Sequence, residues 1–410
     1  MQEKIFSYID SAADLVIQLE TELCKRPAIS PDNGGNGEFE KCEFLKGWLA
    51  SHGITGLERF DAPFPPAKGG IRPSLVATIP GKDNKPDSPR FWIMSHLDVV
   101  PPGEASLWKT DPWKMEVRGD RLIGRGVEDN QQGLTSSVLA ALALVKQGIT
   151  PSRTVKLLFA ADEENGSKYG LVWLLKNHPD LFHKNDLVLI PDSGDEKGGS
   201  IEIAEKSHVW VKFTTKGRQA HAATPQLGTN AYLAAADFTV KLHFGLSEKF
   251  HEKDPLFEPD FSTFQPTKKE PNVPNINTIP GEDVFYCDMR ILPRHPVDEV
   301  FKEVDRIKAE IEKKHGVTIE YTVGQRNESP PTSADSPLVK FLAKNVEEVY
   351  RVKTKPVGIG GGTFAAFLRN AGIDCAVWAR IDHTAHQPNE YALLSNILGD
   401  AKVMALMMVS

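Results

Sequence analysis

Short apolar runs alternate with longer helical patterns from about residue 90 onward, and this alternation limits the possible folds more than any other feature. It is typical of strands joined by crossover helices in a parallel sheet. Buried strands are expected over residues 91–100, 154–164 and 187–194, and helices over residues 134–148 and 170–178. We therefore predict an α/β fold with a mostly parallel sheet and helices on both faces.

The pattern changes near residue 208, where polar and apolar residues begin to alternate. Val209, Val211 and Phe213 recur with the period of a strand that has one face in solvent. A helix over about 230–242, a Pro- and Phe-bearing loop over 253–275, a strand over 283–292 and a charged helix over 297–316 follow. Because 410 residues exceed what one core usually serves, we predict a discontinuous domain (1–208 and 322–410) interrupted by an α+β domain (209–321).

Charge and apolar content exclude several classes of protein. The formal net charge is -7, from 48 Lys and Arg against 55 Asp and Glu, and neither sign gathers in blocks. This argues against nucleic acid or a membrane as the partner. No run of about 18 apolar residues is present, no export signal is visible, and the four cysteines form no C-x-x-C pair. We expect a cytoplasmic protein with reduced thiols.

Side chains able to bind metal follow directly after the apolar runs. The carboxyl ends of parallel strands lie at one edge of an open sheet, so residues placed there converge. Imidazoles and carboxylates without cysteine suit zinc, cobalt or manganese rather than a structural zinc or iron–sulfur site. For any single residue a strand-end cap is the commoner explanation, but the joint placement favours a metal centre. The candidate ligands are His96, Asp129, Glu164, Asp192 and His386.

Position also assigns roles within this set. Asp129, in the Gly-bearing loop GRGVEDNQQG, is the candidate for bridging two ions. Asp98 lies two residues past His96 and suits a hydrogen bond to its other ring nitrogen. Glu163 and Glu164 are adjacent, so their side chains leave the strand end in different directions. We expect Glu164 to bind metal and Glu163 to act as general base, accepting a proton from water and passing it to the leaving amine.

The motifs together resemble the M20 metallopeptidases, the family that includes acetylornithine deacetylase, succinyl-diaminopimelate desuccinylase and PepV-like dipeptidases. The matching segments are SHLDVVPPG, GRGVEDNQQG, ADEENGS, PDSG and HTAHQPNEY, in family order. The resemblance implies a zinc aminopeptidase-like catalytic domain with two divalent ions, zinc first, with cobalt or manganese as alternatives. It implies that Asp129 bridges, that His96 and Asp192 complete one site, and that Glu164 and His386 complete the other.

The resemblance also implies roles outside the metal centre. The domain of residues 209–321 would be a lid that mediates homodimerisation. His221, in a Gly- and Ala-rich loop, would reach the partner subunit's active site and stabilise the tetrahedral oxyanion. The residues implied to meet the substrate carboxylate are Asn277 and Arg290, from NTIPGEDVFYCDMRILP, and Gly361, Gly362 and Thr363, from VGIGGGTFAAFL.

Alternatives exist at individual positions. His383 competes with His386 for the ligand role, but the family places its histidine two residues before Pro-Asn-Glu, which selects His386. The glycine segment lacks the Lys of a nucleotide-binding Walker loop. Phe364 and Ala365 stand where desuccinylases have Ser-Asp, and this is closer to the dipeptidase-type members.

The predicted function is hydrolysis of an amide beside a free carboxylate in a small substrate, by a dipeptidase or an N-acyl amino acid deacylase. Metal-activated water would attack, with Glu163 as general base. The alternative is a non-catalytic binding protein that keeps the fold; it predicts a missing ligand or base, and every expected position is filled. A serine or cysteine hydrolase needs a nucleophile elbow, and Ser193 in PDSGD does not lie in one.

Overall fold

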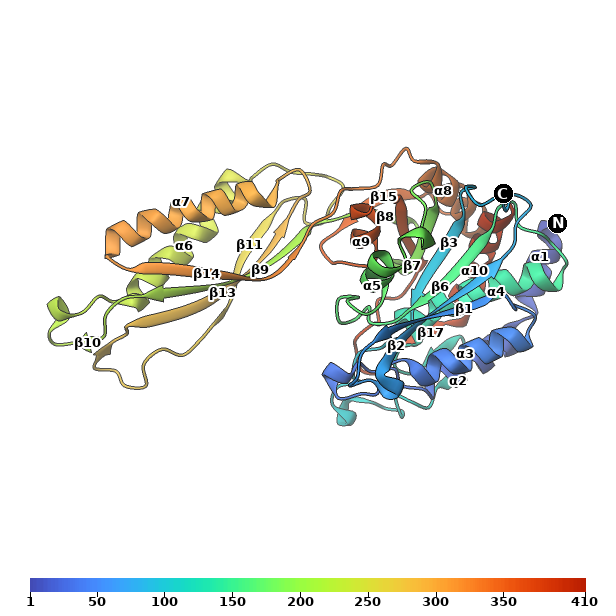
Figure 1. Cartoon of the computed structure of the whole chain (residues 1–410), viewed down its shortest axis with the longest axis horizontal. Helices are drawn as coiled ribbons and strands as arrows, with labels where there is room; N and C mark the ends of the chain where they lie inside the picture. Colours follow the sequence, from blue (N-terminus) through green and yellow to red (C-terminus); the bar gives the residue numbers. More distant parts are fainter. The chain divides into compact units, whose positions relative to one another are not determined.

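The computed structural model describes residues 1–410 and divides them into two compact units (Figure 1). Unit 1 contains Met1–Ile203, Thr332–Val357 and Thr363–Ser410, and unit 2 contains Ala204–Pro331 and Gly358–Gly362. The boundaries expected at 208/209 and 321/322 differ from these. Strand β9 (Ser207–Lys216) begins before the first expected boundary, and strand β14 (Thr318–Asn327) runs through the second. Both strands belong to one sheet of unit 2, so the divisions fall outside them.

Unit 1 is built on an eight-stranded mixed sheet. Its strands are β1 (Leu57–Pro63), β2 (Ile71–Ile79), β3 (Phe91–His96), β6 (Val155–Ala160), β7 (Leu187–Asp195), β8 (Ser200–Glu205), β15 (Lys355–Ile359) and β16 (Cys375–Arg380). The order is β1-β2-β6-β3-β7-β16-β8-β15. β3 pairs parallel with β6 and β7, and β16 pairs parallel with β7, whereas β1 and β2 are antiparallel to their neighbours. The parallel centre confirms the predicted α/β class.

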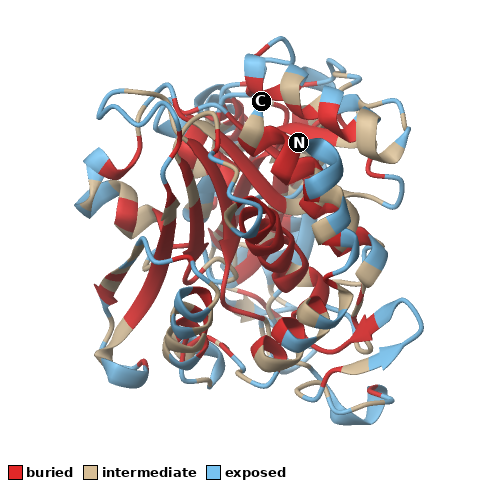
Figure 2. Ribbon diagram, turned by 90° about the vertical axis from the view of Figure 1, so that its right-hand side faces the viewer, coloured by how far each residue is buried: buried red, intermediate tan, exposed pale blue.

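Helices cover both faces of this sheet, whose strands are largely buried (Figure 2). They are α1 (Gln2–Asp10), α2 (Ala13–Cys24), α3 (Phe39–Ser51), α4 (Gly133–Lys146), α5 (Leu171–Asn177), α8 (Pro337–Tyr350), α9 (Ala365–Asn370) and α10 (Leu394–Val409). α4 is buried from Gly133 to Leu144 because it packs on β3, β6 and β7 and also on α10 and α1. Trp92 and Met94 of β3 face the opposite layer and pack with α5 and α9.

Shorter elements lie around the strand ends of unit 1. β4 (Glu116–Arg118), β5 (Arg121–Ile123) and β17 (Tyr391–Leu393) form a three-stranded sheet. A π-helical segment, η4 (Val127–Gln132), precedes α4, and 3₁₀ turns span η1 (Pro31–Asn33), η2 (Lys68–Gly70), η3 (Ala105–Leu107) and η5 (Pro179–Leu181). β17 pairs with β5, with Tyr391 opposite Ile123. This pairing brings the segment after β16 beside the segment before α4.

Unit 2 contains a four-stranded antiparallel sheet packed against two helices. The sheet order is β11 (Thr263–Lys269), β13 (Glu282–Ile291), β9 and β14, and the helices are α6 (Ala231–Lys249) and α7 (Val297–His315). β10 (Ala220–His221) pairs with β12 (Thr278–Ile279), and η6 (Pro225–Leu227) lies between β10 and α6. Val209, Val211 and Phe213 are buried, as their alternation predicts. No helix in either unit has the length and apolar composition needed to span a membrane.

Residues 253–275, expected as a loop, contain the edge strand β11. β11 pairs with β13 from Thr263 opposite Arg290 to Lys269 opposite Phe285, with a register shift between Pro266 and Lys268. Proline cannot donate a ladder hydrogen bond, but an edge strand with a bulge tolerates it. The loop expectation was wrong because the five prolines of residues 253–275 are typical of a loop, whereas only Pro266 lies inside β11, at a sheet edge that tolerates it.

The core of unit 2 depends on Phe213, whose ring stacks on Phe285 at 5.0 Å and meets Phe238 edge-on at 5.2 Å between ring centroids. We predict that Phe213→Ala lowers the free energy of unfolding of unit 2 by about 3–5 kcal/mol, because it leaves a cavity at the centre of this cluster. Urea denaturation followed by circular dichroism measures the change. Phe261→Ala is the control, since this side chain is exposed; its effect should stay within about 0.5 kcal/mol, and equal effects would contradict the assignment of the core.

Candidate metal centre

The candidate ligands gather into two groups, both within unit 1. His96, Asp129 and Asp192 offer ligand atoms that lie within 4.8 Å of one another, and so do Asp129, Glu164 and His386. His96 is the last residue of β3, Asp129 lies in η4, and Asp192 lies in β7. Glu164 and His386 lie in the segments after β6 and β16. The groups therefore assemble where the central strands of the sheet end, and Asp129 is common to both.

Asp129 presents one carboxylate oxygen to each imidazole. Its Oδ1 lies 2.9 Å from Nε2 of His96, and its Oδ2 lies 3.0 Å from Nε2 of His386. The Oδ1 atom of Asp192 lies 3.5 Å from Nε2 of His96, and Oε1 of Glu164 lies 3.2 Å from Nε2 of His386. Each imidazole therefore faces Asp129 and one further carboxylate.

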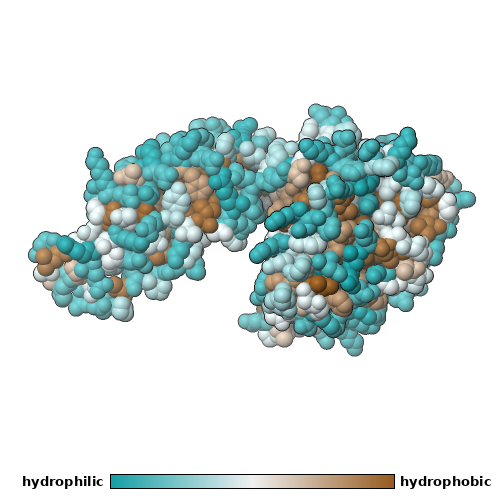
Figure 3. Space-filling model, viewed as in Figure 1, coloured by the Kyte–Doolittle hydropathy of each residue, from teal (hydrophilic) through white to brown (hydrophobic).

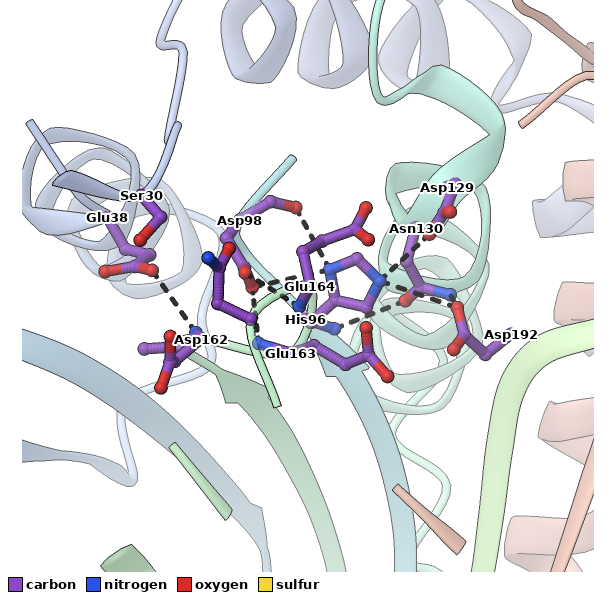
Figure 4. Close-up of polar contacts among 12 residues, drawn as sticks. Ser30, Glu38, His96, Asp98, Asp129, Asn130, Asp162, Glu163, Glu164 and Asp192 are labelled. Carbon is purple, nitrogen blue, oxygen red and sulfur yellow. Dashed lines mark hydrogen bonds and ion pairs between the residues drawn. The ribbon is translucent and has the colours of Figure 1, made fainter. Parts of the chain in front are cut away.

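Asp98 fixes the segment that contains the two glutamates. Its carboxylate accepts hydrogen bonds from the backbone N–H groups of Glu163 and Glu164, each at 3.0 Å. Its Oδ1 is 3.6 Å from Nδ1 of His96, whereas its backbone carbonyl oxygen is 3.0 Å from that nitrogen. Figure 4 shows the ring of His96 between Asp98 and Asp129, with the side chains of Glu163 and Glu164 pointing in different directions. Asp98 thus orients both the imidazole, through its main chain, and the glutamates, through its side chain.

Asn130 is a residue of this centre that sequence reasoning missed. Its Nδ2 donates to Oδ1 of Asp192 and to the carbonyl of Pro191, each at 2.7 Å, and its Oδ1 accepts from the backbone N–H of His96 at 3.3 Å. One amide therefore ties β7 to β3 beside Asp129. Its place directly after Asp129 was the only signal, because the contacts join segments distant in sequence.

A second buried network holds the segment that contains Glu163 and Glu164. Arg72 of β2 is fully buried and forms ion pairs with Glu38 and with Asp162. Asp162 has a positive φ of 65° and its carboxylate accepts from the backbone N–H of Tyr169 at 2.8 Å. These contacts hold the turn that immediately precedes Glu163.

The electrostatics of the site require positive charge. Hydrogen bonds to Asp129 and Glu164 raise the pKa of His386 to about 10. Burial opposes protonation of His96, but hydrogen bonds to the surrounding aspartates raise its pKa well above the ordinary value. Burial, followed by repulsion from Asp129, raises the pKa of Glu164 to about 7, and burial raises the pKa of Glu163 well above its usual range. Protonated imidazoles thus supply the charge that bound cations would supply.

The residues present fit divalent metal. The donors are carboxylate oxygens and imidazole nitrogens, the four cysteines are buried elsewhere, and three ligand atoms converge at each group. This donor set suits zinc, cobalt or manganese. A carboxylate shared between two adjacent ligand groups is the arrangement expected of a two-metal site.

The remaining predicted residues lie apart from the ligand groups in the sequence, mostly in unit 2. His221 is exposed, and its Nδ1 accepts from the backbone N–H of Ala223 at 3.0 Å. The carbonyl of Asn277 accepts from the N–H of Ala222 at 2.9 Å, at the end of the β10–β12 pair in which His221 lies opposite Thr278. Gly361 and Gly362 end the last segment of unit 2, and Thr363 begins a segment of unit 1.

Arg290 of β13 is held by neighbours within unit 2. Its Nε and Nη2 donate to the two carboxylate oxygens of Asp288 at 2.8 and 3.0 Å, and its Nη1 donates to the carbonyl of Gly360 at 2.8 Å. The Nη1 atom also lies 2.8 Å from Nε2 of His208. Arg290 is therefore fixed against the glycine segment that the sequence analysis associated with substrate.

We predict that metal binding releases a proton from His386. With a pKa of about 10 it holds a proton at pH 7 in the metal-free protein, and metal binding needs the neutral imidazole, so the proton must leave. The apparent affinity for Zn²⁺ should rise with pH, by about tenfold per unit for one proton released. Calorimetric titrations in buffers of different ionisation enthalpy measure the number of protons released for each Zn²⁺ bound. His383→Ala, which alters a histidine outside both groups, should leave the number unchanged; heats independent of the buffer would contradict the site.

The chain is similar to known proteins in sequence and in structure. The profile of peptidase family M20/M25/M40 matches residues 92–410. A metallohydrolase of Methanococcus maripaludis, described as uncharacterised, is 37% identical over 96% of this chain and 98% of its own length. A succinyl-diaminopimelate desuccinylase of Coxiella burnetii is 25% identical over 76% of this chain and 81% of its own length. The dipeptidase Dug1p of Saccharomyces cerevisiae has a similar structure, with a TM-score of 0.75 and 17% identity over 100% of this chain and 98% of that one.

The family profile covers well over half of the chain, including every candidate metal ligand. The structural likeness independently supports the fold. The chain belongs to the M20/M25/M40 peptidase family and is a metallohydrolase of that family.

Proposed function

We propose that this M20 metallohydrolase cleaves an amide bond beside a free carboxylate in a small peptide or N-acyl amino acid. It acts with two divalent ions, zinc first, with cobalt or manganese as alternatives. The observation that supports this best is the position of Asp129, with one oxygen toward each of two ligand groups. A cytoplasmic location, inferred from dispersed cysteines without disulfides, stays part of the proposal.

Five side chains would hold the ions. His96 and Asp192 complete one site, Glu164 and His386 complete the other, and Asp129 belongs to both. When bound, the ions supply Lewis acidity toward the scissile carbonyl and toward the attacking water. Asp98 and Asn130 keep the ligands in place by the hydrogen bonds described above.

Glu163 moves the proton. Its backbone is fixed by Asp98, and its carboxyl group makes no hydrogen bond or ion pair within the protein, although burial raises its pKa well above the usual range. In the reaction it accepts a proton from the attacking water and returns it to the amide nitrogen as the C–N bond breaks. Glu164, in contrast, forms a hydrogen bond with His386. The adjacent glutamates therefore divide binding from proton transfer.

We propose roles in oxyanion stabilisation and substrate binding for six further residues, five of which belong to unit 2. Because Nδ1 of His221 accepts a backbone hydrogen bond, the ring proton lies on Nε2, where an exposed N–H can donate to an oxyanion. Asn277, Arg290, Gly361, Gly362 and Thr363 are proposed to bind the substrate carboxylate. The contacts of Arg290 with Asp288 and Gly360 preorganise its guanidinium for this role.

Phe364 bears on the choice between the two substrate classes. Phe364 is fully buried, and its ring meets the ring of His96 edge-on at a centroid distance of 6.2 Å. An apolar side chain here replaces the Ser-Asp of desuccinylases, which supports a dipeptidase or a deacylase of another acyl group over a desuccinylase. The relatives include both a desuccinylase and dipeptidases by name.

The test is hydrolysis of a panel of dipeptides and N-acetyl, N-succinyl and N-formyl amino acids by protein reconstituted with zinc, cobalt or manganese. We predict that Glu163→Gln lowers kcat by about 10²–10⁴-fold, the usual contribution of a general base, and leaves the metal content unchanged. Glu104→Gln, on the surface, is the control. Turnover that survives in Glu163→Gln would refute its role, and no turnover of any substrate by metal-loaded protein would favour a binding protein that keeps the fold.

A homodimer through unit 2 is also part of the proposal. Most of the surface drawn in Figure 3 is hydrophilic, yet α6 exposes Leu233, Val240 and Phe244, at 58%, 55% and 65% exposure, on one side of the helix. α6 packs beside β11, an edge strand of the sheet. A second copy suits this surface because an edge strand and a neighbouring helix can meet their own copies about a twofold axis.

We predict that Phe244→Glu converts the dimer to a monomer, because it places a charge in the apolar surface of α6. Sedimentation velocity over a range of protein concentrations measures the mass. Val117→Glu, at an exposed apolar residue of unit 1, should leave the dimer intact. A wild-type protein that stays monomeric at all concentrations would contradict this part of the proposal.

A further inference from the structure

Two loops of unit 1 meet at the second ligand group. The Asp129 loop (residues 125–132) joins β5 to α4, and the His386 loop (residues 382–391) joins β16 to β17. Each loop contains a buried glutamate that no ligand group includes: Glu128, with 5% exposure, and Glu390, with 1%. Buried carboxylates are costly unless they are hydrogen-bonded, so their partners show what each one does.

Glu128 holds the main chain of the His386 loop. Its Oε1 accepts from the backbone N–H of Asp382 at 2.8 Å, and its Oε2 accepts from the N–H groups of Thr384 and, at 2.7 Å, Ala385. The hydroxyl of Thr384 lies 3.0 Å from the same Oε2. All of these donors lie within four residues of His386. A side chain next to Asp129 in sequence thus fixes the backbone that positions His386.

Glu390 does the reverse. Its Oε2 accepts from Nη1 of Arg125 and from the backbone N–H of Gly126 at 3.0 Å. Its Oε1 accepts from the backbone N–H groups of Glu128 and Asp129 at 3.0 and 3.1 Å. A side chain of the His386 loop thus fixes the backbone that positions Asp129.

The His386 loop needs such an anchor. His383, His386 and Asn389 all have positive φ, at 58°, 62° and 62°. This left-handed region is costly for residues other than glycine, and such residues keep it only where surrounding contacts enforce it. The side chain of His386 is itself 54% exposed, so packing contributes little to its position. The side chain of Asn389 ties the far end of the loop to Leu107 and Lys109. The backbone hydrogen bonds to Glu128 are the contacts that hold the residues directly before His386.

We propose that Glu128 and Glu390 form a reciprocal clasp that positions His386 against Asp129 and so forms the second ligand group before metal arrives. Neither carboxylate touches the ligand atoms, so both are positioning residues. Their effects differ. Glu128 acts on the His386 loop alone, whereas Glu390 acts on Asp129, which both groups share. The inference rests on the proposed two-metal centre and adds how this chain builds it.

The test uses the full-length protein, stripped of metal and titrated with Zn²⁺ against a chromogenic chelator. Glu128→Gln keeps the size of the side chain but turns an N–H₂ group toward backbone N–H donors. We expect it to weaken one of two Zn²⁺ equivalents by about 10–100-fold, the usual effect of losing a partner that orients a ligand, and to leave the other within about threefold. Glu390→Gln should weaken both equivalents, and Glu104→Gln neither.

A milder variant guards against misfolding. Thr384→Val removes one hydroxyl near Glu128 and should weaken the same single equivalent by a smaller factor. The melting temperature of each metal-free variant, measured by circular dichroism, separates a local loss from unfolding. Glu128→Gln that weakens both equivalents alike, or neither, would overturn the clasp.

The outcome is distinct from a failure of the proposed function, because no substrate enters the titration. If wild-type protein bound a single Zn²⁺, the two-metal proposal would fail. The clasp would then be supported only if Glu128→Gln and Glu390→Gln both weakened that ion, and overturned if either left it unchanged.

Discussion

Asp129 lies between two imidazoles, with one carboxylate oxygen about one hydrogen-bond length from each. Asp192 and Glu164 add further carboxyl groups on either side. In water such groups would be solvated, but here they are largely removed from it, and their repulsion has to be offset by positive charge at the centre. The pKa of His386 is raised because Asp129 and Glu164 stabilise its protonated, positively charged form. Divalent cations meet the need for positive charge more completely than protons do, and most features of unit 1 act to keep these ligands together.

The sheet gives the ligands a common origin, and the loops give them their final positions. β3, β6 and β7 run parallel, so His96, the glutamates after β6 and Asp192 reach the same edge. The buried helix α4 directly follows the Asp129 loop and packs against it. The carboxylates of Asp98, Glu128 and Glu390 accept hydrogen bonds from the backbone of the loops, and the amide of Asn130 donates to Asp192. Because these hydrogen bonds hold the loops in place, residues such as His383 and His386 can keep a positive φ.

Much of this was predictable from the sequence, and the reason is local. An apolar run followed at once by His or a carboxylate predicts both a strand and the position of its last side chain, which is why the fold class and the candidates His96, Glu164 and Asp192 follow from the pattern. The choice of His386 over His383 rests on the family resemblance. Contacts between segments that are distant in the sequence produce no such local pattern. Glu128 meets residues more than 250 positions away, and Asn130 joins two strands. β11 was missed because Pro266 obscured an edge strand. β14 was missed because it is the other edge strand and buries only Ile319, so it lacks the regular apolar alternation of β9.

The central claim is that two metal ions bind around Asp129. Anomalous X-ray diffraction from crystals grown with Zn²⁺, recorded on both sides of the zinc absorption edge, tests this most directly. We predict two anomalous peaks about 3.5–4 Å apart, as in other two-metal sites, one beside His96 and Asp192 and the other beside Glu164 and His386. A single peak, or peaks that do not share Asp129, would contradict this claim.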